Sequence, residues 1–111
     1  MLQFEMTYHA KNDRITRFEF ILQTVGAGTK EIATEIFASP TSQNRKAKSV
    51  LMDNGVIYIF SIENNKLITA YIASISQAVA LYKKCHKCNK CPQTLMNVLY
   101  KNQQYVTKQP K

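Results

Sequence analysis

The sequence has no long apolar run and no export signal at its N-terminus. No stretch approaches the roughly 18 consecutive apolar residues that a transmembrane helix needs. The first residues, MLQFEMTYHAKNDR, lack the apolar core and the cleavage site of a signal peptide. Internal repeats, low-complexity tracts and long linkers are missing as well. For a chain of 111 residues, we expect one soluble domain, 1–111, located in the cytoplasm and without a membrane partner.

Acidic side chains are missing from the C-terminal part of the chain. Residues 1–63 carry seven basic and all seven acidic residues, whereas residues 64–111 carry eight lysines and no acid. A region with charge of one sign favours an anionic partner, and nucleic acid is the commonest one. The lysines expected to contact its phosphates are Lys83, Lys84, Lys87 and Lys90. The simpler alternative is a solvated basic tail that serves solubility.

The chain has only three cysteines, an odd number, which argues against a disulfide framework in a protein without a signal peptide. All three lie in the Cys/Lys-rich segment 83–92, KKCHKCNKCP. A Cys-x-x-Cys turn can present two thiolates to one Zn²⁺, and the neighbouring lysines favour deprotonation. Zinc is therefore the candidate cofactor, with Cys85, Cys88 and Cys91 as ligands and His9, a water or a second chain as the fourth. An iron–sulfur cluster, which lacks its fourth cysteine here, and unliganded thiols are the alternatives.

Local signals in the N-terminal half predict one strand and two helices. Residues 2–8 fit a short strand. A capping box over Thr16–Glu19 predicts the start of a helix that ends at the glycines 26 and 28. A second helix is predicted from Thr29 to Ser39, with its apolar residues at helical spacing and a proline after it.

The C-terminal half predicts a sheet followed by helices. Three strands are expected, near 48–52, 56–62 and 66–73. Ser74 and Gln77 form a second capping box, and Pro92 suits the first turn of a last helix. The expected order is β-α-α-β-β-β-α-α. The sequence therefore predicts an α+β fold, with two N-terminal helices packed on a small antiparallel sheet and C-terminal helices after it.

The segment with the most regular pattern is DNGVIYIFSIENNKLITAYIAS, residues 53–74, which predicts a hairpin. With Asn64-Asn65 as a two-residue turn, Tyr58 pairs with Tyr71, and both share a face with Thr69. We expect the aliphatic opposite face to pack on the helices. The open face would then offer hydroxyls to phosphates and an aromatic ring to a base. The alternative is an ordinary solvated sheet face, because Tyr and Thr pair well across strands.

The segments YHAKNDRITR and GVIYIFSIENNKLITAYIAS resemble the RelE and barnase-like superfamily of small ribonucleases and toxins, which includes many proteins of phages and other mobile elements. The resemblance covers roughly residues 7–74. It implies two N-terminal helices on one face of a curved antiparallel sheet, whose open face cleaves RNA, usually without a metal. It also implies RNA rather than DNA as the nucleic acid, and a cognate inhibitor or a host protein as a further partner.

The resemblance implies a set of catalytic residues for transesterification of RNA. His9 would act as base or acid, since an ordinary pKa of about 6.5 allows histidine either role. Arg14 and Arg17 would clamp the phosphate through their planar guanidinium groups. Thr69 and Tyr71 would orient it. Separately from the resemblance, the face assignment of the hairpin makes Tyr58 a candidate contact to the nucleic acid.

Two other classes of function are compatible with the same residues. One is a non-enzymatic binding protein of a phage or mobile element that inhibits a host factor through its surface. The other is a small zinc-stabilised adaptor whose basic C-terminal half binds nucleic acid. Catalysis requires the five residues of the predicted catalytic set to converge in space, whereas binding does not.

Overall fold

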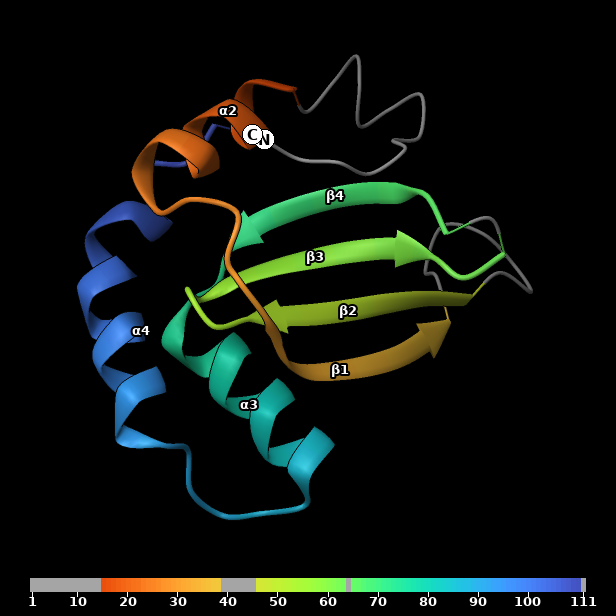
Figure 1. Ribbon diagram of the computed structural model, residues 1–111, viewed down its shortest axis with the longest axis vertical. Coiled ribbons are helices and arrows are strands. Elements are labelled where there is room, and N and C mark those ends of the chain that lie inside the picture. Colours follow the sequence, from red (N-terminus) through yellow and green to blue (C-terminus); the bar gives the residue numbers. More distant parts are fainter. Residues whose placement is uncertain (1–14, 39–45, 64, 111) are drawn as a thin grey trace.

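The computed structural model describes residues 15–38, 46–63 and 65–110 and shows an α+β fold (Figure 1). One helix precedes a four-stranded antiparallel sheet, and two helices follow it. The elements are α2 (Ile15–Thr24), β1 (Glu31–Ala38), β2 (Lys46–Met52), β3 (Val56–Ser61), β4 (Leu67–Ile72), α3 (Ile75–His86) and α4 (Gln93–Val106). The sheet order is β1-β2-β3-β4. The strand expected at 2–8 lies outside the described residues.

Helix α2 forms where the helical spacing of apolar residues predicts it, and it buries Phe18 and Ile21 against the sheet. Its predicted start is wrong, because Thr16 lies inside the helix and is not its N-cap. The predicted end is confirmed. Gly26 has a φ of 82°, and its N–H donates to Ile21 O at the last turn of the helix.

The second N-terminal helix, predicted from Thr29, is wrong, since these residues form strand β1. Their apolar residues fit a helical period, but Ile32, Thr34 and Ile36 are β-branched and recur at every second position. Strand β1 pairs with β2 along its length. The expected helix is therefore replaced by an edge strand, because pairing with β2 satisfies its backbone and outweighs the ambiguous local pattern.

The three predicted strands and both C-terminal helices are confirmed. The turn at Asp53-Asn54-Gly55 is tight: Gly55 has a φ of 85°, and its N–H donates to Met52 O at 3.0 Å. Helix α3 begins with the predicted capping box, in which Gln77 N–H donates to Ser74 Oγ and the Gln77 side chain accepts from Ser74 N–H. Within the described part of the chain, no helix has the length and apolarity needed to cross a membrane.

The predicted register of the β3–β4 hairpin is wrong by one residue. Tyr58 pairs with Ala70 and Ile57 pairs with Tyr71, with a bulge beside Ile59. The connection is longer than two residues, because Ser61 N–H donates to Lys66 O at its base. A shift of one residue moves a side chain to the other face of the sheet. Tyr58 therefore lies opposite to the face that carries Tyr71.

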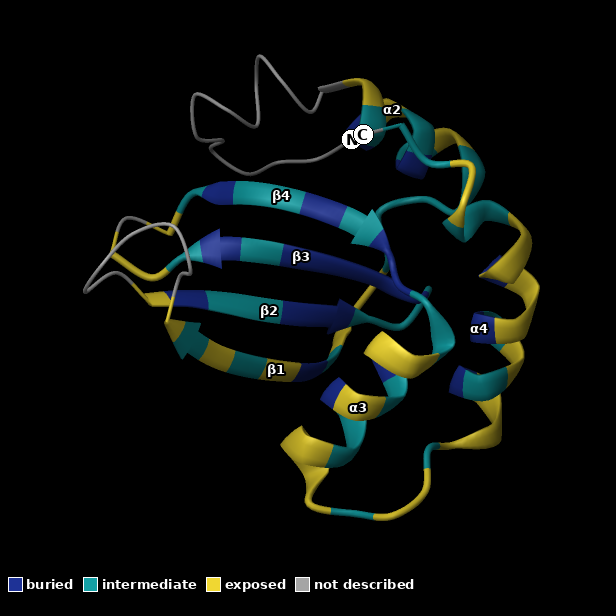
Figure 2. Ribbon diagram, turned by 180° about the vertical axis from the view of Figure 1, so that it is seen from behind, coloured by how far each residue is buried: buried dark blue, intermediate teal, exposed yellow. Residues whose placement is uncertain are grey.

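The side chains of β3 are buried or half-buried on both faces of the sheet (Figure 2). The open face that the sequence predicts is therefore reduced to a hollow of about 190 Å³ beside Tyr58 and Phe60. On the α2 side, Phe18 and Ile21 pack with Tyr58, Phe60 and Ile72. On the α3–α4 side, the cluster consists of smaller aliphatic side chains, namely Ala33, Leu51, Ile57, Ala73, Ala78, Leu81, Leu95 and Leu99. Helix α4 lies along the end of the sheet that carries the β2–β3 turn (Figure 1).

Candidate functional site

The structure brings together two residues of the predicted catalytic set, Arg17 and Thr69. Arg17 Nη1 donates to Thr69 Oγ1 at 3.3 Å and to Ala70 O at 3.5 Å, while its Nε donates to Pro110 O at 2.8 Å. These contacts link α2 to strand β4 and to the C-terminal tail. The guanidinium group therefore has a role in holding the fold. His9 and Arg14 lie outside the described residues.

The two tyrosines of the hairpin have different surroundings. Tyr58 is 1% exposed, and its hydroxyl donates to Ala27 O at 2.8 Å. Burial raises the pKa of Tyr58 to about 12. A ring so enclosed has no free face for a base, so its predicted role in stacking is wrong. Tyr71 is half-buried against the α3–α4 cluster, where burial raises its pKa as well, and it lies apart from Tyr58 across the sheet.

The cysteines occupy the end of α3 and the loop that follows it. Cys85 Sγ accepts from Thr34 N–H at 3.4 Å, on the edge strand β1. The Cys88 thiol donates to Lys90 O at 3.2 Å. Cys91 is half-buried, and burial raises the pKa of its thiol. The three thiols thus have three separate environments.

Among the described residues, no three side chains of His, Cys, Asp or Glu gather closely enough to hold a metal ion. The arrangement of Cys85, Cys88 and Cys91 therefore does not fit a zinc site as it stands. His86 has another partner, since its Nε2 lies 2.6 Å from Ile32 O. Zinc stays a prediction of the cysteine spacing, which elemental analysis of protein purified under reducing conditions tests.

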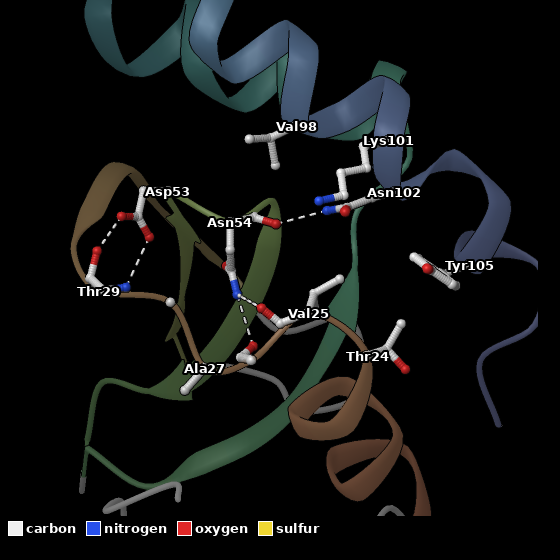
Figure 3. A pocket seen from close by; sticks show the side chains of 12 residues that line it. Thr24, Val25, Ala27, Thr29, Asp53, Asn54, Val98, Lys101, Asn102 and Tyr105 are labelled. Carbon is white, nitrogen blue, oxygen red and sulfur yellow. Dashed lines mark hydrogen bonds between the residues drawn. The ribbon is translucent and has the colours of Figure 1, made fainter.

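A hollow with a volume of about 610 Å³ lies between α4 and the segment that follows α2 (Figure 3). Its walls are residues 24–29, the Asp53-Asn54 turn, and the face of α4 that carries Val98, Lys101, Asn102 and Tyr105. Figure 3 shows Val98 and Lys101 projecting from α4 over Asn54, while Thr24 and Tyr105 stand at one end. We call this the first hollow.

Asn54 holds the walls of the first hollow together (Figure 3). Its Nδ2 donates to Val25 O at 3.1 Å and to Gly26 O at 2.8 Å. Its backbone oxygen accepts from Asn102 Nδ2 at 2.7 Å, and Asn102 is a buried polar residue on α4. Two distant segments, the one that follows α2 and helix α4, are thereby fixed to one turn, because each of these polar groups finds a partner.

Asp53 is the acidic residue that lines the first hollow. Its carboxylate accepts from both the N–H and the hydroxyl of Thr29, and the hydrogen bond from the Thr29 hydroxyl holds the pKa of Asp53 below its ordinary value. Nearby Lys30 acts in the same direction. The carboxylate is therefore ionised at neutral pH, and it is a fixed hydrogen-bond acceptor.

A second hollow, of about 560 Å³, adjoins the first one at Asp53 and Val98. Tyr82 and His86 line it from α3, with ring centroids 4.2 Å apart and an angle of 24° between the rings. Lys30 and Glu31 also line it, one basic and one acidic residue. The bond between His86 Nε2 and Ile32 O fixes the imidazole ring. The second hollow thus has an aromatic wall of fixed orientation.

Sequence reasoning missed most residues of the two hollows. Neither Asp53 nor Tyr82 stands in a motif that indicates a binding site. One usable signal was Asn102, because a polar residue on the stripe formed by Leu95 and Leu99 indicates a buried hydrogen bond. Lys101 gives no such signal, since an exposed lysine on a helix is ordinary.

The fold and its hollows define a small basic α+β protein. No protein-family model matches the chain, and comparisons with curated proteins and with solved structures find no match either. The relation to RelE and barnase-like ribonucleases therefore stays a prediction from the sequence.

Proposed function

We propose that this protein binds single-stranded RNA through the side formed by α3, the α3–α4 loop and α4. The distribution of charge carries the proposal. The acid-free part of the chain, residues 64–111, supplies all of this side. RNA phosphates supply the complementary charge, and release of their counterions on binding favours association with lysines.

The lysines of segment 83–92 differ in their exposure and in the other interactions that they make. Lys84 is paired with Glu35 at 2.9 Å, and Lys83 lies in the last turn of α3, where a positive charge stabilises the helix dipole. Lys87 and Lys90 lie beyond the helix and are exposed. We therefore expect Lys87 and Lys90 to contribute more to phosphate binding than Lys83 and Lys84.

The contacts of the described residues favour RNA binding over RNA cleavage. Arg17 contacts Thr69, but its Nε is engaged by Pro110 O, and Tyr71 packs against the α3–α4 cluster. Binding requires only accessible cations and a surface, both of which the α3–α4 side supplies. Cleavage remains a prediction of the resemblance, and His9 and Arg14, on which it also depends, lie outside the described residues.

Salt dependence tests the proposal. Fluorescence anisotropy with a labelled single strand of about 20 nucleotides should show an affinity that falls with salt, with a slope of about −0.7 in log K against log [salt] per phosphate contact. The double variant Lys87→Gln, Lys90→Gln should lower the magnitude of this slope by about 1.4. The matched control Lys46→Gln, Lys108→Gln removes the same charge at exposed positions elsewhere and should have a smaller effect.

Two results would decide against the proposal. If neither RNA nor DNA binds at low salt, a protein partner becomes the better explanation of the charge. If both double variants lower the slope equally, the charge acts without a defined surface. The same samples, incubated in EDTA and separated by length, also show whether RNA is cut; loss of cutting in His9→Ala would then restore the ribonuclease hypothesis.

A further inference from the structure

The two hollows together form one groove along α4, here called the α4 groove. They share Asp53 and Val98, and the same face of α4 lines both, from Thr94 to Tyr105. At a rise of about 1.5 Å per residue, this part of α4 is roughly 16 Å long. Each hollow has a volume in the range of small-ligand sites, about 300–1,000 Å³. The groove therefore has room for one nucleotide and its phosphate.

The aromatic end of the α4 groove suits a flat, apolar ring. Tyr82 and His86 stand stacked on α3, and Leu95 and Pro92 extend the apolar wall. The imidazole is fixed by Ile32 O, so the stack exists before a ligand enters. Base stacking on such side chains tolerates any of the bases, because every base has a π-face.

The opposite end of the α4 groove suits an anion. Lys101 is exposed on α4 and lines the first hollow together with Thr24 and Tyr105, whose side chains carry hydroxyls. Figure 3 shows the Lys101 side chain directed over the hollow, beside Asn102. An ammonium group with hydroxyls nearby is a common way to hold a phosphate.

Asp53 separates these two ends. Its ionised carboxylate repels a phosphate, so a phosphate in the groove is favoured at Lys101 and disfavoured at the centre. The same carboxylate accepts hydrogen bonds from Thr29 and from the Lys30 N–H, and its two oxygens have about four lone-pair sites, so one further donor can be accepted. The group that fits the centre of the groove is therefore a hydroxyl or N–H donor.

We infer that the α4 groove holds one ribonucleotide of a single-stranded RNA, with the base against Tyr82 and His86, the ribose hydroxyls at Asp53 and a phosphate at Lys101. The inference rests on the proposed function and adds the unit that is recognised. The ribose 2′-hydroxyl is the donor that DNA lacks. The groove consequently selects RNA over DNA at this nucleotide.

The ratio of RNA to DNA affinity is the most specific test. The probes are a fluorescein-labelled hexanucleotide of mixed sequence, made once as RNA and once as DNA. Wild type should bind the RNA form about tenfold more tightly, since loss of a hydrogen bond to a charged group has about this effect. In Asp53→Asn the ratio should fall toward one. The amide keeps the shape and can still bond to Thr29, so the fold is retained.

Lys101→Gln and Lys108→Gln form a matched pair with the same loss of charge. Both lysines are exposed, but only Lys101 lines the groove. For the RNA hexanucleotide, Lys101→Gln should reduce the salt slope by about 0.7, and Lys108→Gln should leave it nearly unchanged. Because Lys101 is exposed, this comparison does not depend on a variant that unfolds.

Tyr82→Leu and Tyr100→Leu test the aromatic end in the same way. Tyr100 is 61% exposed on α4 and lies outside both hollows. Removing a stacking ring should weaken RNA binding about tenfold for Tyr82 and leave it unchanged for Tyr100. Thermal denaturation of both variants checks that the loss is not due to unfolding, since Tyr82 also packs against the α3–α4 cluster.

The outcomes separate this inference from the proposed function. Wild type that binds no nucleic acid overturns both. Wild type that binds, with an RNA-to-DNA ratio unchanged in Asp53→Asn and with Lys101→Gln equal to Lys108→Gln, overturns the inference alone and leaves RNA on the lysines of segment 83–92. A changed ratio together with a distinct Lys101 effect supports the inference.

Discussion

The two faces of the sheet are built in different ways. The α2 side encloses large rings, Phe18, Tyr58 and Phe60, and the Tyr58 hydroxyl is itself paired with Ala27 O. The α3–α4 side has mainly aliphatic side chains at its centre and opens at its margin into the second hollow. The first hollow lies between the two sides, because Val25 and Tyr105 in its wall pack against the α2-side cluster. The face rich in aromatic residues is thus the more closed one, with a hollow of only about 190 Å³ beside Tyr58 and Phe60, and the larger hollows lie at α4.

This difference shows that side-chain chemistry alone does not identify a working surface. Tyrosine suits both a core and a binding site, because it joins a large apolar ring to one polar group. On the α2 side the ring is buried and the hydroxyl fixes the segment after α2. On the α3–α4 side Tyr82 is half-buried and lines a hollow. Accessibility decides which tyrosine can meet a ligand.

The largest expected effect on stability comes from creating a cavity in the core on the α2 side. Phe18 is 1% exposed, and Phe18→Ala should lower the free energy of unfolding by about 3–5 kcal/mol. Leu81, on the α3–α4 side, is 7% exposed, and Leu81→Ala should cost about 2–3 kcal/mol because its site lies nearer to solvent. Urea denaturation at neutral pH measures both. A greater loss for Leu81→Ala would reverse the comparison and make the α3–α4 side the principal core.

A smaller effect is expected from two glycines that have nearly the same φ but different surroundings. An alanine in a left-handed conformation costs about 1–2 kcal/mol, which is all we expect for Gly26→Ala, since nothing lies within 4 Å of its added Cβ. At Gly55 the Cβ would lie 2.7 Å from Asn102 Nδ2, so Gly55→Ala should also weaken the bond from Asn102 to Asn54 O, for a total of about 2–4 kcal/mol.

Chemical denaturation of the two glycine variants provides the measurement. Amide spectra of Asn102 indicate whether its side chain has moved in Gly55→Ala. Equal losses in both variants would mean that α4 yields easily, and the hollow beside it would then be less rigid than the hydrogen bonds of Asn54 indicate.

Local signals correctly predict the features whose interacting residues are close together in the sequence. The capping box at Ser74 and Gln77 specifies its own geometry within a few residues and is confirmed. Gly55 specifies the turn between β2 and β3 in the same local way, through its positive φ. The pattern of residues 31–38 fits both a helix and a strand, and only pairing with β2 decides between them. The wrong register of Tyr58 has a similar origin, because the bulge beside Ile59 is not visible in the pattern.

The candidate site was less predictable than the fold. Its groove is assembled from Lys30, Asp53, Tyr82 and Lys101, which come from four separate parts of the chain. None of them lies in a motif, and no local rule joins them. The basic character of the C-terminal half was evident from the sequence, whereas the position of Asp53 between an aromatic and a cationic end required the fold.

The smallest expected effect concerns a single hydroxyl on the closed side. Tyr58→Phe removes the donor to Ala27 O and leaves that carbonyl without this partner, which should cost about 1–2 kcal/mol at neutral pH. Tyr100→Phe, at an exposed position on α4, should be neutral.

The pKa of Tyr58 is raised from 10.0 to about 12, so the folded state retains its proton where the unfolded state loses it. The contribution of the Tyr58 hydroxyl to the free energy of unfolding is therefore fully present below pH 10.0 and is lost as pH rises toward about 12. Urea denaturation at several alkaline pH values should show a steeper loss in wild type than in Tyr58→Phe; parallel curves would mean that the Tyr58 hydroxyl is accessible to solvent and that the α2 side is less closed than the structure indicates.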